Sequence, residues 1–163
     1  MVLITSIELP VDGYSDINDV PDEVVAAARL CEAAGGNDIQ RPTIDMVNCV
    51  LSDMEIASAF VARMSKNSPV LGLALYEPFD MKRDAPGNTS WIDALAVEKR
   101  ARGLGIGAYM INHLVDVATD RNVDAIRLRS RSDEHTIRFY LKNGFDFEDD
   151  SNQTRMPVMR REI

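Results

Sequence analysis

The sequence predicts an α/β fold in which helices cover the faces of a sheet of mixed direction. Strand-like and helix-like segments follow one another in the order β-α-α-β-β-β-α-β-α-β-β. Residues 56–64 and 70–78 flank the polar turn SKNSP, as expected of a hairpin. No linker-like stretch divides the 163 residues, so we expect a single domain over residues 1–163.

One strand and two helices are expected before this hairpin. Residues 2–9 are rich in β-branched side chains, which is typical of a strand. Residues 19–36 predict a helix, because Pro21 suits a first helical turn and Gly35-Gly36 can end it. Residues 43–54 predict a second helix. The side chains expected on the buried faces of the two helices are Val24, Ala28, Cys31, Ile44, Val47, Leu51 and Met54.

Strands and helices alternate after the hairpin. The expected elements are a strand at 91–97, a helix at 106–121, a strand at 124–131 and a helix at 133–145. Asn143-Gly144 is a good left-handed end for the last helix. The segments FDFEDD and TRMPVMRREI predict two closing strands. Arg127, Arg129 and Arg131 share one face of the strand at 124–131, which is either solvated and paired with carboxylates or offered to an acidic partner such as tRNA.

Composition narrows the class of protein. A net charge of −8 argues against broad nucleic-acid binding and favours cationic partners. The apolar runs are far shorter than the ~20 residues of a membrane helix, and the N-terminus shows no export signal. Cys31 and Cys49 fit no metal or disulfide spacing, so we expect packed thiols, no metal and a cytoplasmic location.

The segment RARGLGIG at 100–107 lies between the strand at 91–97 and the helix at 106–121. A glycine-rich turn that opens a helix can bind an anion, because backbone N–H groups and the positive end of the helix dipole converge there. No Gly-Lys-Ser/Thr follows, which excludes a P-loop, and the glycine spacing is not G-x-G-x-x-G. Taken alone, the turn is either structural or a phosphate site.

Two motifs resemble the GCN5-related N-acetyltransferase (GNAT) family. Arg102-x-x-Gly105-x-Gly107 is similar to the [Q/R]-x-x-G-x-G/A motif with which that family holds the pyrophosphate of coenzyme A. RFYLKNGFDF at 138–147 is similar to its FYxKxGF segment. The specific resemblance covers residues 70–148. It implies a mixed, mostly antiparallel central sheet of about six or seven strands, flanked by about four helices.

The resemblance also implies how acetyl-CoA, the co-substrate, would bind. The strands at 91–97 and 124–131 would splay apart, and the pantetheine arm would pair with exposed backbone of the first like an added strand. One N–H group there would polarise the thioester carbonyl. The residues implied to contact the coenzyme are Leu95, Ala96, Val97, Arg102, Gly103, Leu104, Gly105, Ile106, Gly107, Ala108, Asp133 and Tyr140.

Tyr140 occupies the tyrosine position of the family motif, which implies a general acid for the departing thiolate. From the pattern alone, Tyr140 shares a helical face with Ile137 and Leu141 and could equally be a core residue. Asp133 stands where many relatives have an asparagine that touches the pantetheine. This departure puts that contact in doubt, and helix N-capping is the alternative.

Asp93 is the candidate general base, because relatives often carry an acid on this strand. Alternation places Asp93 on one face with Trp91, Leu95 and Val97, and apolar neighbours would raise the pKa of its carboxyl. An exposed or salt-bridged aspartate, with a water chain acting as the base, is the alternative.

The resemblance therefore implies an N-acetyltransferase that transfers acetyl directly to an amine, either a small molecule or a protein lysine or N-terminus. A binding module that keeps the coenzyme pocket without turnover is the alternative. The acidic surface favours a cationic acceptor. The resemblance is compatible with a monomer and with a homodimer.

Overall fold

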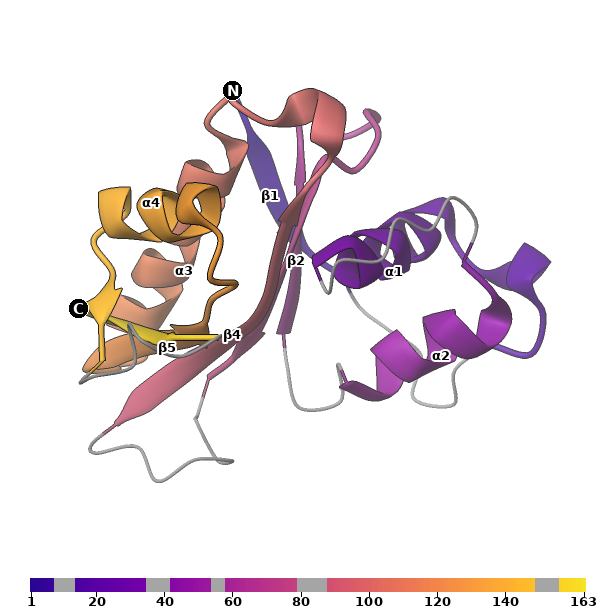
Figure 1. Ribbon diagram of the computed structural model, residues 1–163. Coiled ribbons are helices and arrows are strands. Elements are labelled where there is room, and N and C mark those ends of the chain that lie inside the picture. The colour runs from indigo at the N-terminus through magenta and orange to yellow at the C-terminus, as the bar shows by residue number, and fades with distance from the viewer. Residues whose placement is uncertain (8–13, 35–41, 54–57, 79–87, 149–155) are drawn as a thin grey trace. The chain divides into compact units, whose positions relative to one another are not determined.

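The structure is a computed structural model that describes residues 1–7, 14–34, 42–53, 58–78, 88–148 and 156–163 (Figure 1). It contains two compact units. Unit 1 comprises residues 1–76 and 94–110, and unit 2 comprises residues 77–93 and 111–163. The expectation of a single domain stays a prediction.

The strands form one sheet in the order β1-β2-β3-β4-β5-β7-β6. Their bounds are β1 Leu3–Ser6, β2 Ser58–Arg63, β3 Gly72–Glu77, β4 Thr89–Val97, β5 Ala125–Arg129, β6 Asp146–Phe147 and β7 Val158–Glu162. β4 and β5 pair in parallel. The pairs β1–β2, β2–β3, β5–β7 and β6–β7 are antiparallel. The predicted mixed, mostly antiparallel sheet is confirmed.

Four α-helices accompany the sheet in the described part of the chain: α1 Asp22–Ala34, α2 Ile44–Asp53, α3 Ile106–Asp120 and α4 Glu134–Lys142. Each lies inside a range predicted to be helical. Two short 3-10 helices, η1 Ile17–Asp19 and η2 Lys99–Ala101, were not predicted. η1 is capped by Asp16, which accepts a hydrogen bond from the N–H of Asn18. Val20 is extended, as expected of the residue before a proline, so the helix predicted to start at residue 19 starts after Pro21 instead.

The core of unit 1 joins α1 to the sheet. Its buried side chains include Val24, Ala27, Ala28, Leu30, Val47, Ala59, Val61, Leu73 and Leu75. Cys31 is half-buried against this core, but Cys49 is exposed, so the expectation of two packed thiols is wrong for Cys49. The reason is helical geometry. Cys49 lies two residues after the buried Val47, and residues two apart do not share a helix face. Leu51 and Met54, predicted for the same face, have side chains outside the described residues.

Gly72 allows the start of α3 to lie close to the sheet. A Cβ atom added there would come within 2.7 Å of Met110 Sδ and 3.3 Å of Ile106 Cγ2. Both side chains are buried, and Ile106 is the first residue of α3. The close approach in unit 1 therefore fixes the N-terminal turn of α3 against β3.

In unit 2, Ile126, Leu128 and Met159 form a buried row on β5 and β7. The C-terminus of α4 is fixed by Gly144, whose φ of +81° confirms the predicted left-handed end. Arg161 Nη1 donates to the carbonyl oxygen of Asn143 at 2.7 Å, which places a cation at the negative end of the helix dipole.

Candidate functional site

The glycine-rich segment forms an open turn that leads into α3. Gly103 and Gly105 have φ angles of +81° and +79°, a left-handed conformation that favours glycine. A Cβ atom at either position would meet nothing within 4 Å, so neither glycine is required by the packing of the chain itself. Leu104, between them, is exposed. The turn therefore leaves open space in front of its backbone. We call residues 103–108 the cradle.

The cradle has the electrostatic character of an anion site. The carbonyl of Gly105 accepts from the N–H of Tyr109 at 2.9 Å, so Gly105 opens the helix. The N–H groups of Ile106, Gly107 and Ala108 then precede the first intrahelical donor and have no partner within α3. The first turn of α3 contains no acidic residue that would neutralise the helix dipole. These groups can receive a phosphate oxygen.

Arg102 is held beside this turn. Its Nε donates to the carbonyl oxygen of Val97 at 3.2 Å, while the side chain stays exposed. Only one of the five guanidinium N–H donors is used in this bond. The two terminal nitrogens take no part in that bond, and the guanidinium places its positive charge next to the cradle.

The open edge of β4 begins where its ladder with β5 ends. The ladder ends with Ile92 opposite Leu128, and β4 continues to Val97. The N–H of Glu98 donates to Leu71 next to β3 at 2.8 Å. Because backbone groups alternate between the two edges of a strand, the N–H groups of Val97 and Leu95 face the edge away from β3. Alternation therefore assigns the open edge to Leu95 and Val97 rather than Ala96.

Tyr140 lies in unit 2 and is buried, with 8% of its surface exposed. Its ring makes edge contacts with Phe139 and Phe145, whose centroids lie 5.1 and 5.6 Å away. Burial raises the pKa of Tyr140 to about 12. The phenol therefore carries its proton throughout the neutral range, as a general acid must, although its surroundings are also those of a core residue.

Asp133 caps α4. Its Oδ1 accepts from the N–H of Thr136 at 2.9 Å, which confirms the N-capping alternative. This hydrogen bond lowers the pKa of the Asp133 carboxyl. Asp93 is exposed, and the apolar enclosure expected from strand alternation is not present around it. Its role as a base stays a prediction.

The arginine face of β5 is partly buried. Arg127 is 7% exposed, binds Glu148 through Nε and Nη2 at 2.7 and 3.0 Å, and lies over the ring of Trp91 at 5.7 Å. Arg129 and Arg131 are exposed, and Arg131 lies 3.9 Å from Asp133. Carboxylate pairing, one of the two expectations for this face, is confirmed for Arg127.

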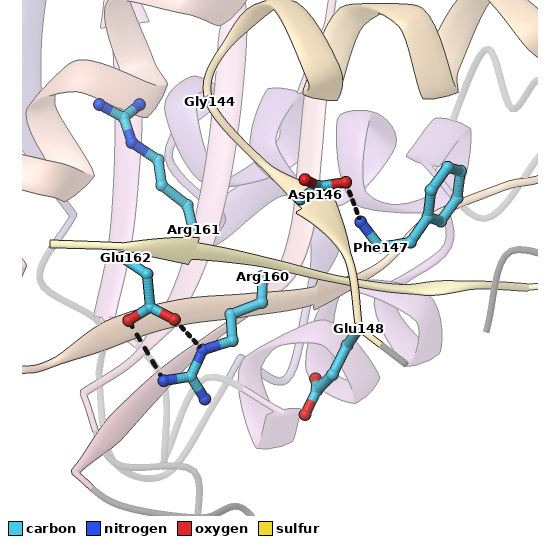
Figure 2. Close-up of a pocket in the computed structure, with 7 residues that line it drawn as sticks. All are labelled: Gly144, Asp146, Phe147, Glu148, Arg160, Arg161 and Glu162. Atoms are coloured by element: carbon cyan, nitrogen blue, oxygen red, sulfur yellow. Dashed lines mark hydrogen bonds and ion pairs between the residues drawn. The ribbon is translucent and has the colours of Figure 1, made fainter. Parts of the chain in front are cut away.

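A pocket of about 400 Å³ lies beside β6 and β7 in unit 2 (Figure 2). It is lined by Gly144, Asp146, Phe147, Glu148, Arg160, Arg161 and Glu162. Among its lining residues Arg160 binds Glu162 at 2.6 Å, and Glu148 binds Arg127, which lies outside the lining. A second pocket of about 340 Å³ lies in unit 1, where Arg29, Arg63 and Arg100 contribute to the wall. Neither pocket contains a predicted catalytic residue.

Within the described ranges, no cluster of three His, Cys, Asp or Glu side chains could hold a metal ion. No helix in that part of the chain is long and apolar enough to cross a membrane.

A family model described as "Acetyltransferase (GNAT) family" matches residues 27–145. No curated protein sequence matches the chain. Among solved structures, a Bacillus subtilis acetyltransferase in complex with CoA is 15% identical with a TM-score of 0.68, covering 100% of this chain and 99% of that one. An acetyl-CoA-bound Elizabethkingia anophelis GNAT acetyltransferase is 15% identical with a TM-score of 0.66, covering 99% and 98%. The Escherichia coli ribosomal-protein-S18-alanine N-acetyltransferase is 18% identical with a TM-score of 0.66, covering 100% and 94%. At these identities the likeness shows the fold.

Proposed function

The chain belongs to the acetyltransferase (GNAT) family, and we propose that it transfers the acetyl group of acetyl-CoA directly to an amine. The observation that carries the proposal is the cradle: two left-handed glycines with open space before them, followed by unpaired helix N–H groups. An anion-binding turn at this place in this family is suited to the pyrophosphate of coenzyme A. Solved neighbours described as bound to CoA or acetyl-CoA support the same co-substrate.

In this proposal the cradle and the open edge of β4, both in unit 1, bind different parts of the coenzyme. The cradle N–H groups and Arg102 hold the two phosphates, because charge-assisted hydrogen bonds are about twice as strong as neutral ones. The open edge of β4 at Leu95 and Val97 pairs with the pantetheine amides. A backbone N–H on the same edge stabilises the oxyanion that develops on the thioester carbonyl, an effect typically of about 3–4 kcal/mol.

The chemistry needs a base and an acid. An alkylammonium group has a pKa of about 10 and must lose a proton before its nitrogen can attack the thioester carbon. Asp93 is proposed to accept that proton, directly or through water. As the carbon–sulfur bond breaks, the sulfur leaves as a thiolate, and Tyr140 is proposed to donate its proton to it. The raised pKa of Tyr140 supports this role in one respect, because the donor is fully protonated at neutral pH.

The acceptor is proposed to be a cationic amine, either a small molecule or a protein lysine or N-terminus. The net charge of −8 supports a positively charged acceptor through long-range attraction. Neighbours of this fold include an enzyme described as acting on the alanine of ribosomal protein S18, so N-terminal amines are within the chemistry of the fold. A cytoplasmic location belongs to the same proposal.

Two measurements test the proposed function. Coenzyme A titration by calorimetry measures binding, and thiol release against a panel of amines measures turnover. We expect saturable binding and acceptor-dependent thiol release. Isotope-labelled acetyl-CoA added to lysate, followed by mass spectrometry, then identifies the acceptor. Tight binding without thiol release from any amine or lysate fraction would instead indicate a binding module without turnover.

A further inference from the structure

Glu98 makes three contacts with other residues of unit 1. Its N–H donates to the carbonyl of Leu71 at 2.8 Å, and its own carbonyl accepts from the N–H of Ala101 at 2.8 Å. Its carboxylate forms an ion pair with Arg29 of α1, a residue far away in the sequence. The carboxylate makes no capping bond to η2, so its orientation is set by Arg29. Glu98 thus joins β3, η2 and α1 at one residue.

The chain from Glu98 to the cradle is short and tightly held. η2 begins directly after Glu98, and Ala101 at its end is 3% exposed. Arg102 follows and is bonded to the Val97 carbonyl. The glycines that come next have nothing within 4 Å of their Cβ positions. Since Gly103 and Gly105 meet no neighbours there, the path of residues 103–105 depends on the segment before them and on the start of α3, which is packed against β3 through Ile106.

A second ion pair offers a matched comparison. Arg63 at the end of β2 pairs with Glu23 of α1, and the same pocket is lined by Arg29, Arg63 and Glu23. The two pairs have the same chemistry and similar exposure, with side-chain values of 37% and 18% for Arg29 and Glu98, and 16% and 45% for Arg63 and Glu23. Both connect α1 to another part of unit 1, Arg63–Glu23 to the end of β2 and Arg29–Glu98 to the residue before η2. Only the Arg29–Glu98 pair includes a residue of the segment that leads into the cradle.

We propose that Arg29 is a positioning residue for the coenzyme A cradle: by fixing the Glu98 carboxylate, it sets the path of η2 and therefore the position of the Gly103–Gly105 turn in front of the α3 N–H groups. This inference rests on the proposed function. Arg29 touches neither the cradle nor the reacting atoms in this account and acts through Glu98. Networks of this kind change ligand affinity by small but measurable factors.

The test compares Arg29→Met with Arg63→Met in the full chain. Methionine keeps much of the aliphatic volume and removes the charge. We expect the Kd for coenzyme A to rise roughly 3- to 30-fold in Arg29→Met and to stay within about twofold of wild type in Arg63→Met. Arg29→Lys, which keeps the charge, should recover most of the affinity. Adding Glu98→Gln to Arg29→Met should weaken binding little further, because both changes break the same pair.

A second readout needs no ligand. In a ¹H–¹⁵N NMR spectrum of the ligand-free protein, the amide signals of Gly103, Gly105 and Gly107 should shift in Arg29→Met and not in Arg63→Met. Equal Kd values and equal glycine signals in the two variants would overturn the inference. If the wild-type protein binds no coenzyme A, the proposed function fails, and the glycine signals alone still decide whether Arg29 sets the direction of the turn.

Discussion

Replacing Gly105 with alanine tests whether the glycine turn binds phosphate or has only a structural role. Gly105 has a φ of +79°, and a Cβ atom there would meet nothing within 4 Å. The variant therefore creates no clash, and the expected loss of stability is the left-handed penalty of about 1–2 kcal/mol. That loss would be seen as a lower urea midpoint with an unchanged slope.

The expected effect on binding is larger. The new methyl group would stand in the space that a phosphate must enter to reach the N–H groups after Gly105. Losing one charge-assisted hydrogen bond costs about 1.5–3 kcal/mol, which corresponds to a Kd for coenzyme A that rises about 10- to 150-fold. Isothermal titration calorimetry with coenzyme A measures this directly, and 4′-phosphopantetheine, which has one phosphate, should show a smaller change.

Gly144→Ala is the control. Gly144 has a φ of +81° and ends α4, and its Cβ position lies 3.4 Å from the flexible Arg161 side chain. This variant carries the same backbone penalty outside the cradle, so it should lose similar stability and keep its affinity. The reasoning would be refuted if Gly105→Ala lost stability to the same degree as Gly144→Ala and bound coenzyme A as the wild type does.

Four further outcomes are expected. Tyr140→Phe should lower kcat by roughly 10²–10⁴ while the Kd for coenzyme A stays nearly constant, as measured by steady-state kinetics and calorimetry. Asp93→Asn should remove the acidic limb of the pH–rate profile, and an unshifted profile would point to a water chain. The unfolded state releases the Tyr140 proton near pH 10 and the folded state only near 12. The free energy of unfolding should therefore fall by about 2–3 kcal/mol between these pH values relative to Tyr140→Phe, in urea titrations at each pH. Asp133→Ala should lose about 1 kcal/mol at pH 7 through the lost N-cap. Because the pKa of Asp133 is lowered on folding, this difference should shrink as the pH falls below 3.8, and its persistence in acid would exclude the cap.

Local features of the sequence predicted most of the elements and their ends. Gly144 and Asp133 act within a few residues of their own positions, as a left-handed end and an N-cap, so the prediction needed no tertiary information. The conformation of the cradle glycines was predictable from local sequence in the same way. Their positive φ angles are a property of the turn, and the turn is encoded in consecutive residues.

Contacts between distant segments could not be predicted. The Arg29–Glu98 pair joins residues 69 positions apart, and nothing in either neighbourhood indicates the other. Arg127 reads as an exposed residue in an alternating strand, yet Glu148, 21 positions later, allows it to be buried. For Asp93 the exposed alternative holds, and its role as a base stays a prediction. Strand alternation gave it apolar neighbours in sequence, while its exposure depends on how the sheet is covered.

A structure of the protein crystallised with acetyl-CoA tests the central claim most directly. The account predicts phosphate oxygens within hydrogen-bond distance of the N–H groups of residues 105–108, with the Arg102 guanidinium beside them. Electron density for the coenzyme elsewhere on the protein, with the cradle N–H groups facing only solvent at saturating ligand, would contradict it.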